Sequence, residues 1–175
     1  AKERAHLHFE LALRLSDRFA QWRREREPDQ RNDHGEWNGQ NLVGLDAARL
    51  LREQARLGTD LSLRRFIRDQ PELCRVQVRA TNFPWLKRYP ALVETNTRAG
   101  QTGVAGYELC FNYAGLPILT ISRAAPEMRS QSRMCLISVN EKERAARPCG
   151  KLVMKRGDQW VLTHAGERLI DLLTF

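Results

Sequence analysis

The sequence predicts an α+β fold, because segments with strand periodicity and segments with helix periodicity follow one another along the chain. Residues 5–15 alternate between apolar and polar side chains, which is the period of a strand with one buried face. Residues 47–57 instead repeat apolar side chains three and four positions apart, as an amphipathic helix does. Beyond Pro71 most segments alternate again. We therefore expect two units, residues 1–58 and residues 59–175.

In the first unit, a long polar stretch separates the predicted strand from the predicted helix. Residues 16–41 show little periodicity, so we expect a surface loop there. Trp22 and Trp37 within it have two interpretations: they anchor the loop to the core, or they line a substrate cleft. Asp46 is a good N-cap for the helix, and Gly58 is a good terminator.

The second unit combines two helices with a series of strands. We expect a helix that starts at Thr59 or Asp60 and stops at Pro71. Residues 134–139 form a continuous apolar run, which predicts a strand buried on both faces, and Thr163 is a good cap for a final helix. The other strand patterns lie at residues 75–80, 107–113, 116–122, 151–155 and 159–163. The turns between 113 and 116 and between 155 and 159 contain glycine, which predicts two hairpins.

The strand pattern at the start of the chain carries two histidines, His6 and His8, two positions apart. On a strand such residues share a face, with Cα atoms about 6.6 Å apart, whereas on a helix they diverge. Neutral imidazole is a common zinc ligand, and a second imidazole beside a metal can transfer the proton of a bound water. The alternative is a pair of solvated histidines on a sheet face.

The segment His6-Leu7-His8-Phe9-Glu10 resembles the last conserved motif of the lysostaphin-like zinc endopeptidases, which cut peptide cross-links in bacterial cell walls. The resemblance implies that His6 is catalytic and that His8 binds Zn²⁺. Glu10 shares their face and either orients a histidine as a hydrogen-bonded carboxylate or forms a surface ion pair. Residues 41–51 resemble the end of such domains, with Ala47 where proline is commoner. About residues 1–57 would then be the terminal strands of a lysostaphin-like β-sheet peptidase domain, followed by a small α+β module.

The zinc site implied by this resemblance is incomplete in the chain. The family's other two ligands come from an upstream His-x-x-x-Asp motif, and the sequence contains no such motif. A catalytic zinc ordinarily has three protein ligands and a water. We therefore expect the chain to be the C-terminal portion of a longer enzyme and to be inactive alone.

The charge of the chain predicts anionic partners. Its formal net charge is +8, and basic surfaces attract wall polymers, lipid headgroups and nucleic acid through the same long-range field. With the family resemblance, this implies peptidoglycan or another anionic cell-wall polymer as partner and a cell-envelope location, periplasmic or extracellular. The sequence contains no run of about 18 uncharged apolar residues, so we expect no membrane span.

A second hypothesis is a non-catalytic basic module that binds a cell-wall polymer, a protein or DNA. The last hairpin and helix, residues 151–173, look like the wing and closing helix of winged-helix DNA-binding domains. A winged helix needs a recognition helix that enters the major groove, and the residues before this hairpin have strand patterns instead. This argues against nucleic acid as the partner.

Overall fold

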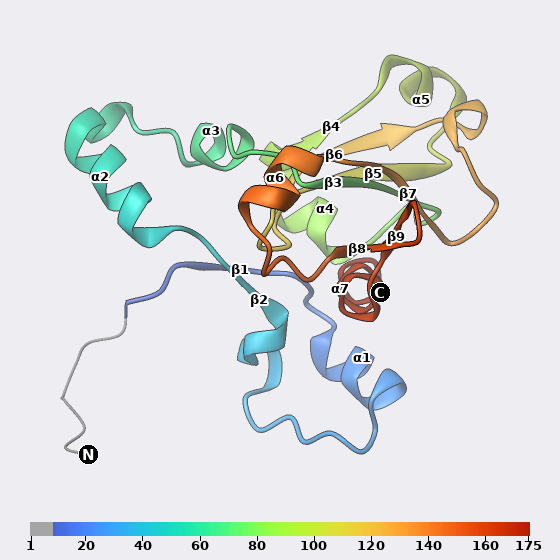
Figure 1. The fold of residues 1–175 in the computed structure, drawn as a ribbon, viewed down its shortest axis with the longest axis horizontal. Coiled ribbons are helices and arrows are strands. Elements are labelled where there is room, and N and C mark those ends of the chain that lie inside the picture. The colour runs from blue at the N-terminus through green and yellow to red at the C-terminus, as the bar shows by residue number, and fades with distance from the viewer. Residues whose placement is uncertain (1–8) are drawn as a thin grey trace.

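The computed structural model describes residues 9–175, and helices and strands are mixed along the whole of that range (Figure 1). The helices are α1 (Phe19–Arg26), α2 (Ala47–Leu57), α3 (Leu63–Arg68), α4 (Pro84–Arg88), α5 (Thr97–Thr102), α6 (Glu141–Ala146) and α7 (His164–Leu173). The strands are β1 (Ala12–Arg14), β2 (Leu42–Gly44), β3 (Cys74–Val78), β4 (Val93–Glu94), β5 (Gly106–Phe111), β6 (Pro117–Arg123), β7 (Met134–Val139), β8 (Val153–Arg156) and β9 (Gln159–Leu162). The fold is therefore α+β, as the sequence predicts. None of the helices in this range is long and apolar enough to cross a membrane.

A five-stranded sheet with the order β4-β6-β5-β3-β7 forms the centre of the structure. β4 runs parallel to β6, and the other neighbouring pairs are antiparallel. β5 and β6 form the predicted hairpin, and Gly115 in its turn has a φ of 88°, which few other residues adopt without strain. Two small antiparallel sheets, β1-β2 and β8-β9, complete the strand pairing.

Helix α7 lies between the central sheet and α1 (Figure 1). Its residues Ile170, Leu172 and Leu173 are buried in the core. At its start, Gly166 approaches β8 so closely that an added Cβ would lie 2.3 Å from the carbonyl oxygen of Leu152. The predicted N-cap is confirmed, because the Thr163 hydroxyl accepts a hydrogen bond from the amide of Gly166.

Buried side chains from before and after residue 58 belong to one hydrophobic core. The contributors before that position are Leu15, Phe19, Trp22 and Val43. They join the inner face of the central sheet and α7. The predicted boundary at residue 58 stays a prediction from sequence patterns.

We expected the polar stretch 16–41 to be a surface loop, but it contains helix α1. Phe19 and Trp22 face the core, so Trp22 anchors the segment. The first amides of α1 are capped by Glu36, whose carboxylate accepts from Phe19 N and Ala20 N at 3.1 Å each. This cap lies far along the chain, so the local pattern before the helix does not reveal it.

The strand predicted at residues 5–15 is shorter where the structure describes it. Only Ala12–Arg14 forms β1, and residues 9–11 are outside a strand, although Leu11 O still accepts a hydrogen bond from Leu45 N at 2.7 Å. β2 is equally short, which leaves little backbone for further pairing.

Three details of the second unit differ from the sequence prediction. Helix α3 is capped by Ser62 rather than by Thr59 or Asp60, which lie in a preceding 3-10 turn. Strand β7 is at the edge of the sheet and half-buried, not buried on both faces, since it pairs with β3 alone. The short helix α6, capped by Asn140, lies between β7 and β8 where we expected no helix.

Candidate functional site

Among the three residues proposed for the zinc site, only Glu10 lies within the described part of the chain. His6 and His8 lie outside the described residues. Glu10 is exposed just before β1, and none of the ion pairs within residues 9–175 includes it. Both interpretations of Glu10, as an orienting carboxylate and as a surface charge, therefore stay open.

Strand β1, which follows this motif, is firmly fixed to the body of the protein. Its apolar residue Leu13 packs against the core, and Leu15 just beyond it is buried. The hydroxyl of Tyr89 accepts from Arg14 N at 3.0 Å and donates to Arg14 O at 3.2 Å. Leu13 therefore points inward, and its neighbours Ala12 and Arg14 lie on the other face of the strand, with Ala12 exposed and Arg14 half-buried.

A second anchor holds the turn that brings residues 35–41 beside β1. The side chain of Asn41, which is completely buried, accepts from Ser16 N and donates to Ser16 O, at 2.9 Å each. It also donates to Glu36 O at 2.8 Å. Together with the Glu36 cap on α1, these bonds hold the 3-10 turn Gly35–Trp37 through its middle residue, Glu36.

Trp37 at the end of this turn is exposed, unlike Trp22. Its side chain is 70% exposed, whereas that of Trp22 is 1% exposed. The guanidinium of Arg14 lies 5.1 Å from the centre of the Trp37 ring, a cation–π contact. Of the two interpretations that the sequence allowed, Trp22 is a core anchor and Trp37 is free to contact a ligand.

The described residues do not assemble a metal site. Within residues 9–175, no three His, Cys, Asp or Glu side chains come close enough together to hold a metal ion. His34 and His164 are both exposed, one before the 3-10 turn and the other at the start of α7. The residues described here therefore do not by themselves fit a catalytic zinc.

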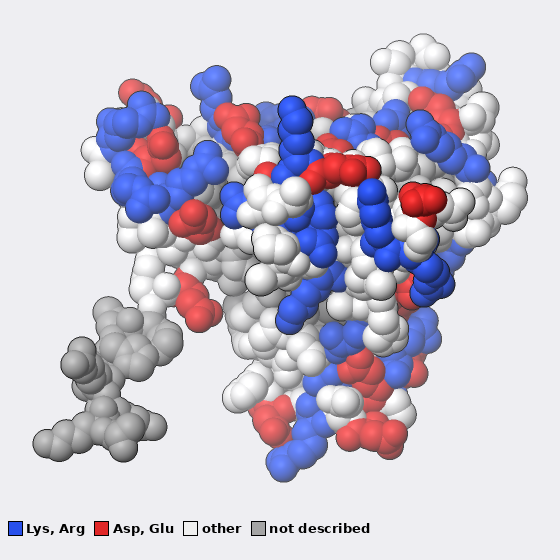
Figure 2. Space-filling view, in the orientation of Figure 1, with Lys and Arg blue, Asp and Glu red and all other residues white. Residues whose placement is uncertain are grey.

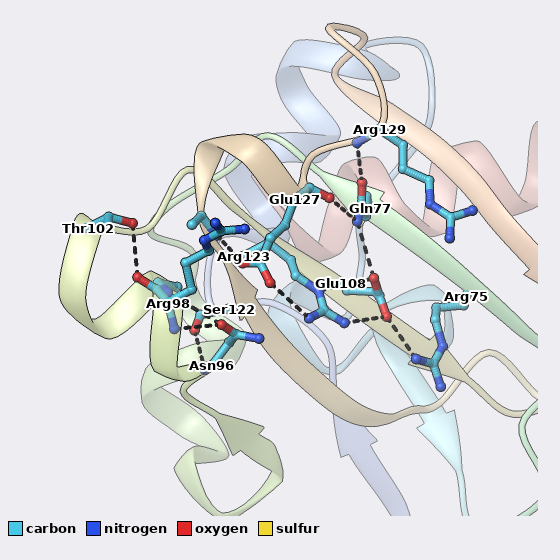
Figure 3. Close-up of polar contacts among 12 residues, drawn as sticks. Arg75, Gln77, Asn96, Arg98, Thr102, Glu108, Ser122, Arg123, Glu127 and Arg129 are labelled. Atoms are coloured by element: carbon cyan, nitrogen blue, oxygen red, sulfur yellow. Dashed lines mark hydrogen bonds and ion pairs between the residues drawn. The ribbon is translucent and has the colours of Figure 1, made fainter.

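The outer face of the central sheet carries a network of charges around Glu108 (Figure 3). Glu108 on β5 is 5% exposed and accepts from Arg75 on β3 at 2.8 Å and from Arg123 on β6 at 2.9 Å. Gln77 on β3 donates to the same carboxylate at 3.2 Å. Gln77 also donates to Glu127 O at 3.0 Å and accepts from Arg129 N at 2.8 Å. The network thus ties the segment after β6 to the sheet.

The electrostatics of Glu108 favour a structural role. Burial raises the pKa of its carboxyl, but the hydrogen bonds from Arg123, Arg75 and Gln77 outweigh this and hold the pKa below its usual range. A carboxylate with a low pKa is a weak general base at neutral pH. All its partners are protein groups, so we interpret this cluster as part of the scaffold.

A second charged cluster joins α1 to α7. Asp171 accepts from the indole nitrogen of Trp22 at 2.6 Å and pairs with Arg26 and Arg133. One turn earlier, Arg168 pairs with Glu27 at the end of α1 and lies 5.0 Å from the Trp22 ring centre. The sequence gives no signal for these contacts, because the partners on α1 and α7 are more than 100 positions apart and Arg133 lies 38 positions before Asp171.

A mainly apolar cavity lies between the end of β5 and the start of α7. Its volume is about 410 Å³, and its lining includes Tyr113, Cys149, Lys151 and Leu169. Cys149 is exposed, and all four cysteines, which lie within the described residues, are free thiols. Arg147 at the rim is already engaged, because it pairs with Glu143 at 2.6 Å and stacks on Tyr113 at 4.0 Å.

Comparisons with protein families, with curated proteins and with solved structures found no match for the chain.

Proposed function

We propose that the chain is the C-terminal portion of a lysostaphin-like zinc endopeptidase that cleaves the peptide cross-links of peptidoglycan in the cell envelope. The observation that carries the proposal is the segment His6-Leu7-His8-Phe9-Glu10, which resembles the family's last motif residue by residue. Residues 41–51, which resemble the end of such domains, also support the proposal, because helix α2 begins within this segment, directly after Asp46.

Each histidine has a distinct role in this proposal. His8 would bind zinc, and His6 would hold or transfer a proton at the reacting centre. When bound, the metal supplies Lewis-acid activation of the scissile amide and of a water. The remaining ligands would come from residues upstream of this chain. The terminal strands of the peptidase sheet would include β1 and β2, with residues 59–175 as an additional α+β module of unassigned role.

The test uses the product of the complete gene. We expect its purified form to contain about one zinc ion per chain, measured by atomic emission, and to release dye from labelled peptidoglycan. His8→Ala should lose the zinc and the activity together. His6→Ala should keep the zinc and lose the activity, because the proton-transferring group is removed and the metal ligand stays.

The matched controls are His34→Ala and His164→Ala, since both of these histidines are exposed and neither lies in the motif. Both variants should keep zinc and activity. A gene product without zinc, or one that keeps its zinc after His8→Ala, would contradict the proposal.

A second candidate function, the basic binding module, is favoured by the arginines of α2 and α3. These are Arg49, Arg52, Arg56, Arg64, Arg65 and Arg68. Figure 2 shows basic side chains gathered over this part of the surface, with acidic ones among them. Exposed pairs such as Arg56–Glu53 and Arg65–Asp69 contribute little energy, so a polyanion can replace them.

The binding-module candidate predicts a charge effect at a defined place. Arg52→Glu combined with Arg64→Glu should abolish sedimentation with a purified anionic wall polymer at low salt. Arg129→Glu combined with Lys142→Glu changes the net charge equally, but at other exposed positions. Equal loss in both double variants would indicate non-specific attraction and would remove this candidate.

A further inference from the structure

We propose that Trp37 is a stacking platform for a sugar ring of the peptidoglycan glycan strand, with Arg14 as its polar partner. This inference rests on the proposed function for the identity of the polymer. It adds a binding site for the glycan, which is distinct from the peptide bond that is cleaved.

The first observation is the unusual exposure of Trp37. Its exposed fraction of 70% exceeds that of Phe9, the next most exposed large apolar side chain in the described range, at 57%. Of the other three tryptophans, Trp22 and Trp85 are buried and Trp160 is half-buried. Leaving an indole in water forgoes the free energy of burying a large apolar surface, which a ligand can recover on binding.

The second observation is that this exposed side chain stands on a rigid base. The backbone before it is held by Glu36, which caps α1, and by Asn41, which binds Ser16 and the carbonyl of Glu36. Trp37 N itself donates to His34 O at 3.0 Å. A ligand that stacks on Trp37 therefore orders little additional chain, and the entropic cost of binding is low.

The third observation is the position of Arg14. Its guanidinium lies 5.1 Å from the centre of the indole ring and is held by Asp17 at 2.8 Å. Arg14 is at an even position of the alternating segment, the same parity as the two motif histidines.

The chemistry of this pair fits an N-acetylated aminosugar. The C–H bonds on one face of a pyranose ring carry partial positive charge and match the electron-rich face of an indole. Arg14, whose side chain is 19% exposed, lies with its guanidinium over the indole ring, and its N–H groups that are not engaged by Asp17 can donate to hydroxyl or acetamido oxygens. A peptide cross-link is flexible and offers no flat face of this kind. Unpaired nucleic-acid bases do, so they are the alternative to be tested.

The experiment titrates the full chain with tetra-N-acetylchitotetraose and records tryptophan fluorescence, in the presence of a chelator. Because Trp37 is the tryptophan most open to solvent, we expect a saturable change with a Kd of about 1 mM, typical of one stacking contact. Trp37→Ala should weaken binding by about tenfold or more, measured by calorimetry, since the variant lacks the reporter. Arg14→Ala should weaken it less, because the indole stays in place.

The matched control is Trp160→Phe. It removes a half-buried indole on β9, far from Trp37 in the sequence, and should leave sugar binding unchanged. Circular dichroism checks that each variant is folded. No saturable binding by the wild-type chain, or equal binding by Trp37→Ala, would overturn the inference. Tighter binding of single-stranded DNA than of the sugar, lost in Trp37→Ala, would reassign the platform to nucleic acid and overturn it too.

These results are separable from those for the proposed function. The chelator removes zinc, so sugar binding does not depend on a metal site. Zinc binding through His8 without sugar binding would leave the endopeptidase proposal in place and remove the platform. Sugar binding by a gene product that holds no zinc would instead remove the endopeptidase proposal and leave a glycan-binding surface.

Discussion

Helices α2 and α7 have nearly the same length and an apolar stripe each, yet only α7 contributes buried residues to the core. Four residues of α7 are buried, and α2 has no buried residue. Both begin with a side-chain cap, Asp46 for α2 and Thr163 for α7. α2 extends away from the central sheet, whereas α7 lies against it (Figure 1). An amphipathic pattern thus predicts which face can be buried, but not whether another element covers it.

The largest expected effect in this comparison comes from the core residue of α7. Leu173 is completely buried, so Leu173→Ala leaves a cavity and should lower the free energy of unfolding by about 2–5 kcal/mol. Urea denaturation followed by circular dichroism measures the change. Leu173→Met keeps the volume and should cost less than about 1.5 kcal/mol. A loss below about 0.5 kcal/mol for the alanine variant would show that α7 is not part of the cooperative core.

The polar side of α7 should give the next largest effect. Asp171→Ala leaves the buried indole N–H of Trp22 without its acceptor and removes the pairs with Arg26 and Arg133. We expect a loss of about 2 kcal/mol at pH 7. Trp22 fluorescence should also shift, because the contact between α1 and α7 loosens. An unchanged free energy of unfolding would mean that these helices are held by apolar packing alone.

The same substitution should depend on pH. Burial raises the pKa of Asp171, but hydrogen bonds from Trp22, Arg133 and Arg26 and the charge of Arg133 outweigh it and lower the pKa below the usual 3.8. A lowered pKa in the folded state stabilises the protein above the unfolded-state pKa, and this contribution is lost as the pH falls through the folded-state pKa. The difference in stability between wild type and Asp171→Ala should therefore shrink as the pH is lowered from 7 to below 3.8. A stability difference that does not change with pH would show that the ionised carboxylate of Asp171 is not the source of the stabilisation.

Local signals in the sequence predicted the elements whose ends are fixed by neighbouring residues. Asp46 and Gly58 define α2, Thr163 defines the start of α7, and Gly115 allows the hairpin of β5 and β6. Helix α1 was missed because its cap is not local. Glu36 accepts hydrogen bonds from the amides of Phe19 and Ala20, which precede it by 17 and 16 positions. Its sequence is also largely charged, so it lacks a strong helical stripe.

The candidate site was less predictable than the fold. The sequence identifies the motif residues, but His6 and His8 lie outside the described residues, so their geometry stays a prediction. The sequence also left Trp22 and Trp37 equivalent. Their different exposure depends on tertiary contacts, since Trp22 packs between α1 and α7 and Trp37 is held outward by the anchors of its turn. Glu108 on β5 likewise has its charged partners on two other strands, Arg75 on β3 and Arg123 on β6, so the network cannot be read from one segment.

The caps of the two helices give a smaller and sharper test. Thr163→Ala removes the acceptor for Gly166 N and should lower the global free energy of unfolding by about 1 kcal/mol. Asp46→Ala removes the acceptor for Arg49 N, but it should only increase fraying of α2, because that helix has no buried residue. Urea denaturation measures the global effect, and hydrogen exchange of the α2 amides measures the local one. Equal global losses would show that α2 folds cooperatively with the core.

The smallest expected effect is that of Leu51→Ala in the apolar stripe of α2. Leu51 is 52% exposed, so the substitution removes few contacts and replaces leucine with a slightly better helix former. The free energy of unfolding should change by less than about 0.5 kcal/mol, in contrast to Leu173→Ala. Leu50, which packs against the core from the same helix, provides the internal control, because Leu50→Ala should cost more than Leu51→Ala. A loss of stability at Leu51 comparable to that at Leu173 would mean that another molecule covers the apolar stripe of α2 in solution. The two helices would then differ in what covers them, and not in whether they are buried.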